Sequence, residues 1–269
     1  PMARLLITPP TAEPISVSAL KAHARIDHAE DDDSGTGLLS TLIAAARGRL
    51  EELTRRAFVC QTWDLKMDGF PAEFRIPLPP LMGISYITYV DTAGDLQTLD
   101  EEDYVVDAVS SPARVRAAYG VSWPSTYDEP NVVTVRFVAG YAAPFSVNTT
   151  TNLLTATGGR TFTDGEVVRL TTSDRDLPAP LAVATDYYVR DASSGTCKLA
   201  LTSGGAAIDI TDAGTGTHFI GEIPAGLCHA IKMLCAHWYE NREASAVGAQ
   251  AALVPEAVDA LAWQFRCDL

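Results

Sequence analysis

The chain has 269 residues, of which 47% are hydrophobic and 20% charged, and its formal net charge is −14 at pH 7. This acidic balance argues against tight binding of nucleic acid, because proteins that track phosphates need clustered Lys and Arg. The mean hydropathy of +0.06 and the lack of any apolar run of membrane-spanning length are typical of a soluble globular protein with no membrane partner.

Five cysteines are scattered along the sequence and form no CxxC pair. An odd number of dispersed cysteines favours free thiols in a reducing cytoplasm over a disulfide framework or a zinc site. The start of the sequence lacks the pattern of a signal peptide, so we expect none.

The first predicted helix covers residues 17–25 and follows a proline-rich extended arm over residues 3–15. Next comes the acidic run 30–33, which invites comparison with a calcium loop. An EF-hand loop needs Gly at its sixth position and Glu at its twelfth, and no frame of this sequence provides both. We therefore interpret the run as a solvated acidic loop that leads into the next helix.

Two longer helices are predicted far apart in the chain, over residues 37–57 and 223–242. Each carries one apolar stripe at spacings of three and four residues, which has to be covered by tertiary contact. The two stripes can cover each other, so we predict a helical bundle as the core of the fold. The stripes consist of Leu39, Leu42, Ile43, Leu50 and Leu53 in the first helix and of Leu227, Ile231, Leu234 and Trp238 in the second.

Between these helices the hydrophobic period changes to two. Residues from about 59 to 141 alternate β-branched and aromatic residues between turn signals, which predicts an antiparallel sheet of about five strands. Residues 145–222 contain fifteen threonines and short candidate strands without any helical period, which is typical of a small sandwich or barrel. The predicted fold is therefore α+β: a connector core from residues 1–144 and 223–269, and an inserted all-β domain at 145–222.

A linker of small residues precedes a last predicted helix over residues 255–266, which starts at Pro255. This helix is apolar on one side, at Val258, Leu261 and Phe265. The pattern leaves two alternatives open: the helix packs back onto its own core, or it docks on a partner.

Catalytic motifs are missing from the sequence. His229 and His237 share a predicted helix, but there is no HExxH and no repeated Glu-x-x-His pair. There is no GxSxG nucleophile elbow, and the glycine pairs lack the Lys-Ser or Lys-Thr of a phosphate loop. We therefore predict no enzyme activity, no catalytic residue, no cofactor and no metal.

Six segments carry a family resemblance through their order along the chain. They are RIDHAEDDD (25–33), LLSTLIAAARGRLEELTRRA (38–57), QTWDL (61–65), PLPPLMGISYITYVDTAGD (77–95), VTVRFVAGYA (133–142) and IPAGLCHAIKMLCAHWYENREA (223–244). In this order they resemble the head-tail connector, or adaptor, proteins of long-tailed bacteriophages and gene transfer agents. Residues 145–222 depart from that pattern, because family members normally pass almost directly from the strand to the helix. The inserted segment itself resembles a small β module of phage virion proteins.

The resemblance implies a structural virion protein in the neck, at the head-tail interface, assembled in the cytoplasm of a bacterial host. Its copies are expected to form a ring, a dodecamer, beneath the portal protein. The ring would extend the DNA channel, let double-stranded DNA pass without tight binding, and join the capsid to stopper or tail-completion proteins. The alternative is a carbohydrate- or protein-binding accessory module that acts through residues 145–222.

The resemblance also implies which residues contact the portal. In that family the C-terminal segment typically engages the portal protein, which agrees with the docking alternative for the last helix. The residues implied are Leu253, Pro255, Val258, Leu261, Trp263 and Phe265.

Overall fold

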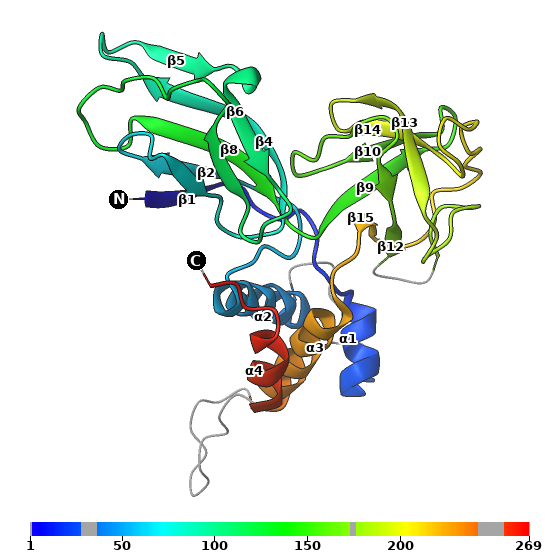
Figure 1. Ribbon diagram of the computed structural model, residues 1–269. Helices are drawn as coiled ribbons and strands as arrows, with labels where there is room; N and C mark the ends of the chain where they lie inside the picture. The colour runs from blue at the N-terminus through cyan, green and yellow to red at the C-terminus, as the bar shows by residue number, and fades with distance from the viewer. Residues whose placement is uncertain (1, 28–36, 173–175, 242–255, 269) are drawn as a thin grey trace, which may run out of the picture.

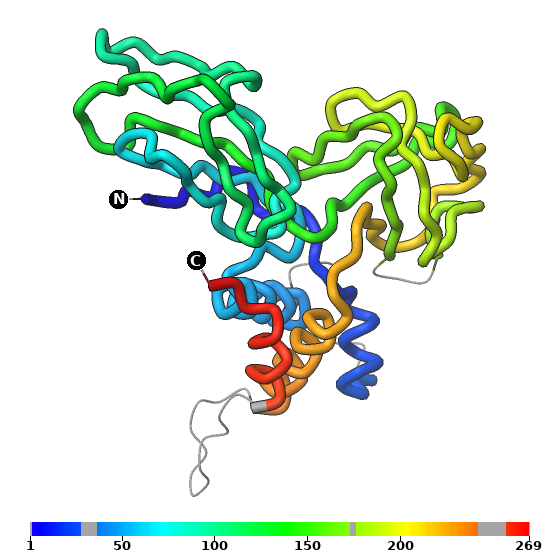
Figure 2. The backbone as a smooth tube through the Cα atoms, in the orientation of Figure 1, coloured from blue at the N-terminus to red at the C-terminus, as the bar shows by residue number. Residues whose placement is uncertain are grey.

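The computed structural model describes residues 2–27, 37–172, 176–241 and 256–268. Two β units stand side by side above a layer of helices, so that the molecule has the outline of a Y (Figure 1). The path of the chain enters the first β unit, descends to the helices, returns through both β units and ends beside the helices (Figure 2). The acidic run 30–33, for which we predicted a solvated loop, lies outside the described residues.

The prediction of a helical bundle as the core of the fold is wrong. In the described residues strands account for 35% and helices for 21%, with four α-helices and a seven-stranded sheet that nearly closes into a barrel. The prediction gave the two helical stripes too much weight, because a long regular hydrophobic period is easy to detect in a sequence. Two of the three large apolar clusters lie in the β units, whose strands pair with partners distant in the sequence.

The first β unit is a five-stranded antiparallel sheet with a small second sheet packed on it. The large sheet has the order β1-β2-β8-β4-β5, and the small one the order β3-β7-β6. Phe74 and Val115 of the small sheet share a core with Leu65, Val135 and Phe137 of the large one. The bounds are β1 (Met2–Thr8), β2 (Gln61–Met67), β3 (Glu73–Arg75), β4 (Leu81–Val90), β5 (Leu96–Leu99), the 3₁₀ helix η2 (Glu101–Asp103), β6 (Tyr104–Asp107), β7 (Arg114–Ala117) and β8 (Val133–Ala139).

The second β unit is the seven-stranded sheet, in the order β11-β13-β14-β10-β9-β15-β12. Its two edge strands, β11 and β12, are separated only by Arg169, and they pair with β13 and β15 respectively. One short segment therefore belongs to both edges, which brings the sheet close to closure. The bounds are β9 (Ala142–Asn148), β10 (Leu153–Ala156), β11 (Val167–Val168), β12 (Leu170–Thr172), β13 (Tyr187–Ser193), β14 (Thr196–Ala200) and β15 (His218–Gly221).

The chain enters and leaves the second β unit at one place. Only Gly140 and Tyr141 separate β8 from β9, and Gly221 at the end of β15 is paired with Ala142 at the start of β9. Entry and exit are therefore neighbouring residues of one sheet. This unit comprises residues 142–221, slightly offset from the 145–222 expected from the sequence.

The four helices are α1 (Val17–Ala24), α2 (Leu38–Thr54), α3 (Ala225–Glu240) and α4 (Glu256–Trp263). The side chain of Ser16 caps α1 by accepting a hydrogen bond from the backbone N–H of Ala19 at 3.1 Å. The helices share one apolar cluster. Of the predicted stripe residues, Leu39, Ile43, Leu50, Leu227, Ile231 and Leu234 are buried in this cluster, and Leu42, Leu53 and Trp238 are half-buried against it.

Among the helices of the described residues, none has the length and apolar character that crossing a bilayer requires.

Candidate assembly interface

Strand β1 presents apolar side chains to solvent along its whole length. Met2, Leu5, Leu6 and Ile7 are 56, 55, 40 and 37% exposed. Within the described residues, the strand lies at the edge of its sheet and is paired only with β2. Long apolar edge strands are normally protected by another element, because their free N–H and C=O groups can pair with a further strand.

The apolar side chains of β1 point to both faces of the sheet. Leu6 lies opposite Trp63 in β2, and Leu5 lies opposite Asp64. Because side chains alternate along a strand, Leu6 shares the face that carries the first β unit's core, whereas Leu5 lies on the other face. The same strand carries one cation, Arg4, whose guanidinium lies 5.9 Å from the centroid of the Trp63 ring.

The opposite edge of the same sheet is acidic. In the part of the chain that the structure describes, strand β5 is paired only with β4. Its first residue, Leu96, is 72% exposed. From Asp91 to Asp103 the sequence contains no Lys or Arg. The carboxylates in this stretch are Asp91, Asp95, Asp100, Glu101, Glu102 and Asp103.

The turn that leads into β5 is held by one carboxylate. Asp91 accepts hydrogen bonds from the backbone N–H of Ala93 at 2.9 Å and of Asp95 at 3.0 Å, and from the amide of Gln97 at 2.8 Å. These bonds lower the pKa of Asp91, the bond from Asp95 most strongly. The β5 edge is therefore an ordered acidic surface.

Further apolar side chains are exposed in the loops of the first β unit. Val109 and Tyr119 are almost fully exposed, and Val121 and Tyr127 are 39 and 42% exposed. The backbone N–H of Tyr127 donates to the carbonyl of Val90 at 3.0 Å, which places this residue beside the end of β4. Apolar groups of this kind are common in surfaces that bind other proteins.

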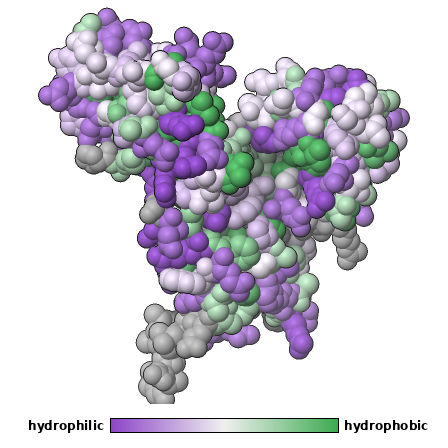
Figure 3. All heavy atoms as spheres, viewed as in Figure 1, coloured by the Kyte–Doolittle hydropathy of each residue, from purple (hydrophilic) through white to green (hydrophobic). Residues whose placement is uncertain are grey.

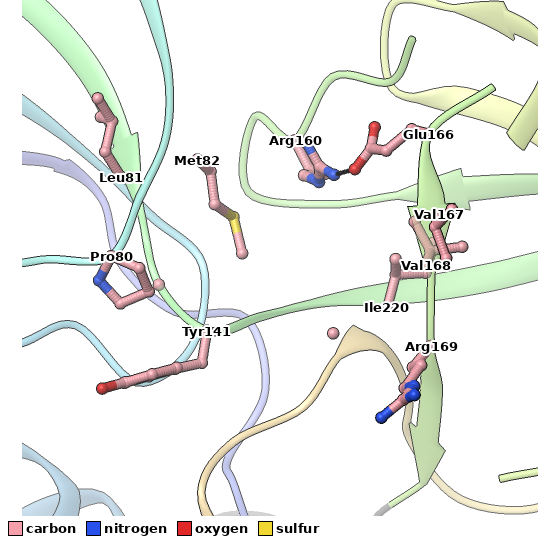
Figure 4. Close-up of a pocket in the computed structure, with 12 residues that line it drawn as sticks. Pro80, Leu81, Met82, Tyr141, Arg160, Glu166, Val167, Val168, Arg169 and Ile220 are labelled. Atoms are coloured by element: carbon pink, nitrogen blue, oxygen red, sulfur yellow. Dashed lines mark hydrogen bonds and ion pairs between the residues drawn. The ribbon is translucent and has the colours of Figure 1, made fainter. Parts of the chain in front are cut away.

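A crevice of about 390 Å³ separates the two β units. Figure 3 shows hydrophobic residues on both walls of the hollow between the units. In Figure 4, Met82 points into the crevice from β4, and Arg160 pairs with Glu166 on the opposite wall. Arg169 is paired with Asp186. Because both lining arginines are neutralised by carboxylates, the crevice resembles a packing junction more than a binding site for a charged ligand.

The C-terminal helix α4 packs on the protein's own helices. Val258 is 1% exposed, and Leu261 and Phe265 pack half-buried against the same cluster. The backbone N–H of Cys267 donates to the carbonyl of Thr54 at 2.9 Å, which fixes the end of the chain to the end of α2.

The residues that the resemblance assigned to portal docking therefore fall into three groups. Leu253 and Pro255 lie outside the described residues. Val258, Leu261 and Phe265 face their own protein. Trp263 is 60% exposed and lies 4.4 Å beneath the guanidinium of Arg266.

The two histidines considered as ligands lie apart from any cluster of metal-binding groups. His229 contacts His23 edge to face, with 5.5 Å between the ring centroids, and His237 lies beside Asn241. Burial lowers the pKa of His23, and the neighbouring His229 and Lys232 lower it further. Within the described residues, no group of three or more His, Cys, Asp or Glu is arranged to hold a metal ion.

The β1 edge is the feature that sequence reasoning missed. We predicted an extended arm over residues 3–15 because of its prolines, and so overlooked the strand that precedes them. The signal was present in the run Met2–Ile7, where five of six residues are apolar and three of them consecutive. Such a run predicts a strand with both faces covered, whereas both faces are exposed here.

No protein-family model matches this sequence, and no curated protein matches it significantly. Solved structures do match its fold. A chain in the neck of an empty gene transfer agent particle, computed with C6 symmetry, matches with a TM-score of 0.56 at 15% identity, over 99% of this chain and 96% of that one. A chain in the virion of a native gene transfer agent particle matches with a TM-score of 0.53 at 15% identity, over 100% of this chain and 96% of that one. A chain in the neck of a native gene transfer agent particle, computed with C12 symmetry, matches with a TM-score of 0.50 at 17% identity, over 98% of this chain and 96% of that one.

The family resemblance indicated by the sequence segments is thus confirmed as a likeness of fold to chains of gene transfer agent necks. One expectation needs correction. We expected relatives to pass almost directly from β8 to α3, but these matches cover at least 98% of this chain and so include the seven-stranded unit. For these neighbours the second β unit is a shared part of the fold.

Proposed function

We propose that this chain is a structural protein of a virion neck: a head-tail connector, or adaptor, whose copies form a ring beneath the portal. The observation that carries this proposal is the match over nearly the whole chain to chains from gene transfer agent particles, two of them described as necks. Those necks were computed with C6 and C12 symmetry, which agrees with a ring of twelve copies around one axis.

The surface of the protein supports a role in assembly. The five-stranded sheet has exposed apolar residues at both edges, Leu5 at one and Leu96 at the other. The ion pairs Arg136–Asp64, Arg160–Glu166 and Arg169–Asp186 of the two β units join opposite charges that neutralise each other. A sheet with one apolar edge and one acidic edge that carries an exposed leucine is suited to contacts with other proteins.

The net charge of −14 suits a ring through which DNA passes. Carboxylates facing a lumen repel the phosphate backbone, so DNA slides without being held. In the proposed neck the ring extends the portal's channel and offers its other side to a stopper or tail-completion protein.

Contact with the portal is proposed for the C-terminal region. Trp263 is a large exposed aromatic at the end of α4, and aromatic residues of this kind often anchor protein interfaces. Since α4 itself packs on α2 and α3, we propose that this helix stays on the body of the protein and presents Trp263 to the portal. Leu253 and Pro255, which lie outside the described residues, remain part of the proposed portal contact.

The proposal is tested by the mass of the purified protein, alone and with the portal protein of the same particle, using light scattering and electron microscopy. We expect rings whose mass is a multiple of 28.7 kDa and which bind one face of the portal. A protein that stays monomeric at all concentrations and does not bind the portal would contradict the proposal.

A second candidate function is an accessory binding module in the seven-stranded unit. A cavity of about 740 Å³ in this unit is lined by apolar residues that include Leu181 and Val183, and Val183 is 57% exposed. Such a cavity could take a carbohydrate or a peptide.

The two functions are separated by removing the second β unit. Because Ala142 and Gly221 are paired neighbours, a short Gly-Ser linker from Tyr141 to Glu222 can close the gap. Rings that persist without residues 142–221, with loss of a surface contact only, would make this unit an accessory. Loss of rings from a protein that still folds would make it part of the assembly.

A further inference from the structure

We propose that the β1 edge of one copy pairs with the β5 edge of the next copy. The five-stranded sheets of neighbouring copies would then join into one continuous sheet around the ring. This inference deepens the proposed function and depends on it, because it names the surfaces through which copies of the connector meet.

A closed ring needs two different surfaces that fit each other, since each copy contacts one neighbour on either side. The two edges of the five-stranded sheet meet this condition. β1 and β5 lie at opposite ends of the strand order, and each is paired with one strand only. They are also separated in space across the first β unit (Figure 1).

The directions of the strands define how the two edges would join. All four neighbouring pairs in the sheet are antiparallel, so β1 and β5, the first and fifth strands, run in the same direction. If the sheet continues into a second copy with its faces unchanged, β5 of one copy and β1 of the next are parallel. The junction is therefore a parallel pair inside an otherwise antiparallel sheet.

The exposed apolar side chains fall on matching faces. Leu5 lies opposite Asp64, on the face away from the core of the first β unit. In β5, Leu99 lies opposite Ile87 and is buried in that core. Leu96 is three residues earlier and so points to the other face. In the continuous sheet Leu5 of one copy and Leu96 of the next share a face, where each covers apolar surface that is open in the single chain.

The charges favour this pairing over the pairing of two identical edges. β1 carries Arg4 and no acidic residue, whereas β5 is flanked by exposed carboxylates at Asp95, Asp100 and Glu101. Two β5 edges would bring these carboxylates together and repel each other. A β1 edge brings a cation towards them instead. Charge thus favours the head-to-tail contact that closes a ring.

The direct test is a cross-link between copies. Leu5→Cys and Leu96→Cys are combined in the full chain, and the assembled protein is oxidised or treated with a short bismaleimide. We expect a ladder of covalent multimers on a denaturing gel. The control combines Leu5→Cys with Val183→Cys, an exposed position in the other β unit, and should give no ladder.

The native cysteines should not obscure this result. All five are buried or half-buried, and burial raises the pKa of Cys60, Cys197, Cys228 and Cys235. Their thiolates are therefore scarce at the pH of the reaction.

A charge exchange provides the second test. Arg4→Glu should raise the protein concentration needed for half-assembly about tenfold, and adding Glu101→Arg to this variant should recover most of the loss. The matched control is Arg116→Glu, an exposed residue of β7, which should leave assembly unchanged.

The outcomes separate this inference from the proposed function. Rings that form normally but give no Leu5–Leu96 cross-link, and that tolerate Arg4→Glu, would overturn the inference and leave the connector function standing. A protein that forms no oligomer, alone or with the portal, would contradict the proposed function and the inference together.

Discussion

The guanidinium Nε of Arg56 donates a hydrogen bond to the carbonyl oxygen of Phe265, a residue 209 positions further along the chain. Arg56 lies two residues after the end of α2, and Phe265 lies two residues after the end of α4. This bond and the neighbouring bond from Cys267 to Thr54 attach the C-terminal segment to the body of the protein. The last helix is therefore part of the helical layer, and its contribution to stability can be measured separately from any contribution to docking.

Truncation of Val258 is expected to affect mainly the stability of the protein, and truncation of Trp263 mainly its binding to the portal. Val258→Ala removes apolar volume at a position that is 1% exposed and should lower the free energy of unfolding by about 1.5–3 kcal/mol. Trp263→Ala should cost less than about 1 kcal/mol, because the ring is mostly in solvent. If Trp263 anchors the portal, the same change should weaken portal binding. Urea unfolding and a binding titration check both effects; equal affinity in wild type and Trp263→Ala would exclude Trp263 as an anchor.

Gly140 is expected to resist substitution because it lies where the chain passes between the two β units. Its φ is +144°, and an added Cβ would lie 2.7 Å from the backbone nitrogen of Cys60. Gly140→Ala should therefore destabilise the protein by at least about 2 kcal/mol. The control is Gly48→Ala in α2, where a Cβ meets nothing within 4 Å and Ala should stabilise the helix by about 0.5–1 kcal/mol. Thermal unfolding of the two variants should shift in opposite directions.

Asp107 gives stability a defined dependence on pH. Hydrogen bonds from the Ser110 side chain at 2.6 Å and from Arg114 at 2.7 Å hold the pKa of its carboxyl well below the usual value of 3.8. A carboxyl whose pKa is lower in the folded state stabilises that state above pH 3.8, and this stabilisation is lost as the pH falls through the folded pKa.

The variant Asp107→Asn should accordingly be less stable than wild type at pH 6, and the difference should shrink below pH 3.8. Unfolding in urea at a series of pH values measures this difference. A gap between the two proteins that stays constant down to pH 2 would show that ionisation of Asp107 has no effect on stability.

Cys60, Cys197 and Cys235 should be almost unreactive in the folded protein. Burial raises the pKa of Cys60, Cys197 and Cys235 to about 12. At pH 8 roughly one in ten thousand of these thiols is ionised, and the thiolate is the reactive form. We expect Ellman's reagent to modify them slowly in the native state and rapidly in guanidinium chloride. Rapid native modification of Cys60 would mean that the junction beside Gly140 opens in solution.

The local regularities of the sequence predicted the helices well. Residues 37–57 and 223–242 were expected as helices and appear as α2 and α3, within a few residues of those bounds. Their buried stripe residues follow from spacings of three and four. Helices can be predicted in this way because their hydrogen bonds join residues four positions apart, so the information lies within one segment.

Strand pairing could not be derived in the same way. β1 pairs with β2, more than fifty positions away, and β2 with β8, about seventy positions further on. The predicted fold class was wrong for this reason. The two helical stripes could be recognised within single segments, whereas the strands could not be paired because their partners were unknown. The exposed edge of β1 also became visible only once its single partner was placed.

The sequence by itself determined which segments are helical, where the period of two begins and which residues are apolar, because these properties depend on neighbours within a few positions. Only the tertiary structure decided that β structure predominates, that α4 packs on its own protein, and that Leu5 and Leu96 stand at opposite edges of one sheet. These features depend on contacts between distant segments. Such contacts stabilise the fold only after the chain has brought the two segments together.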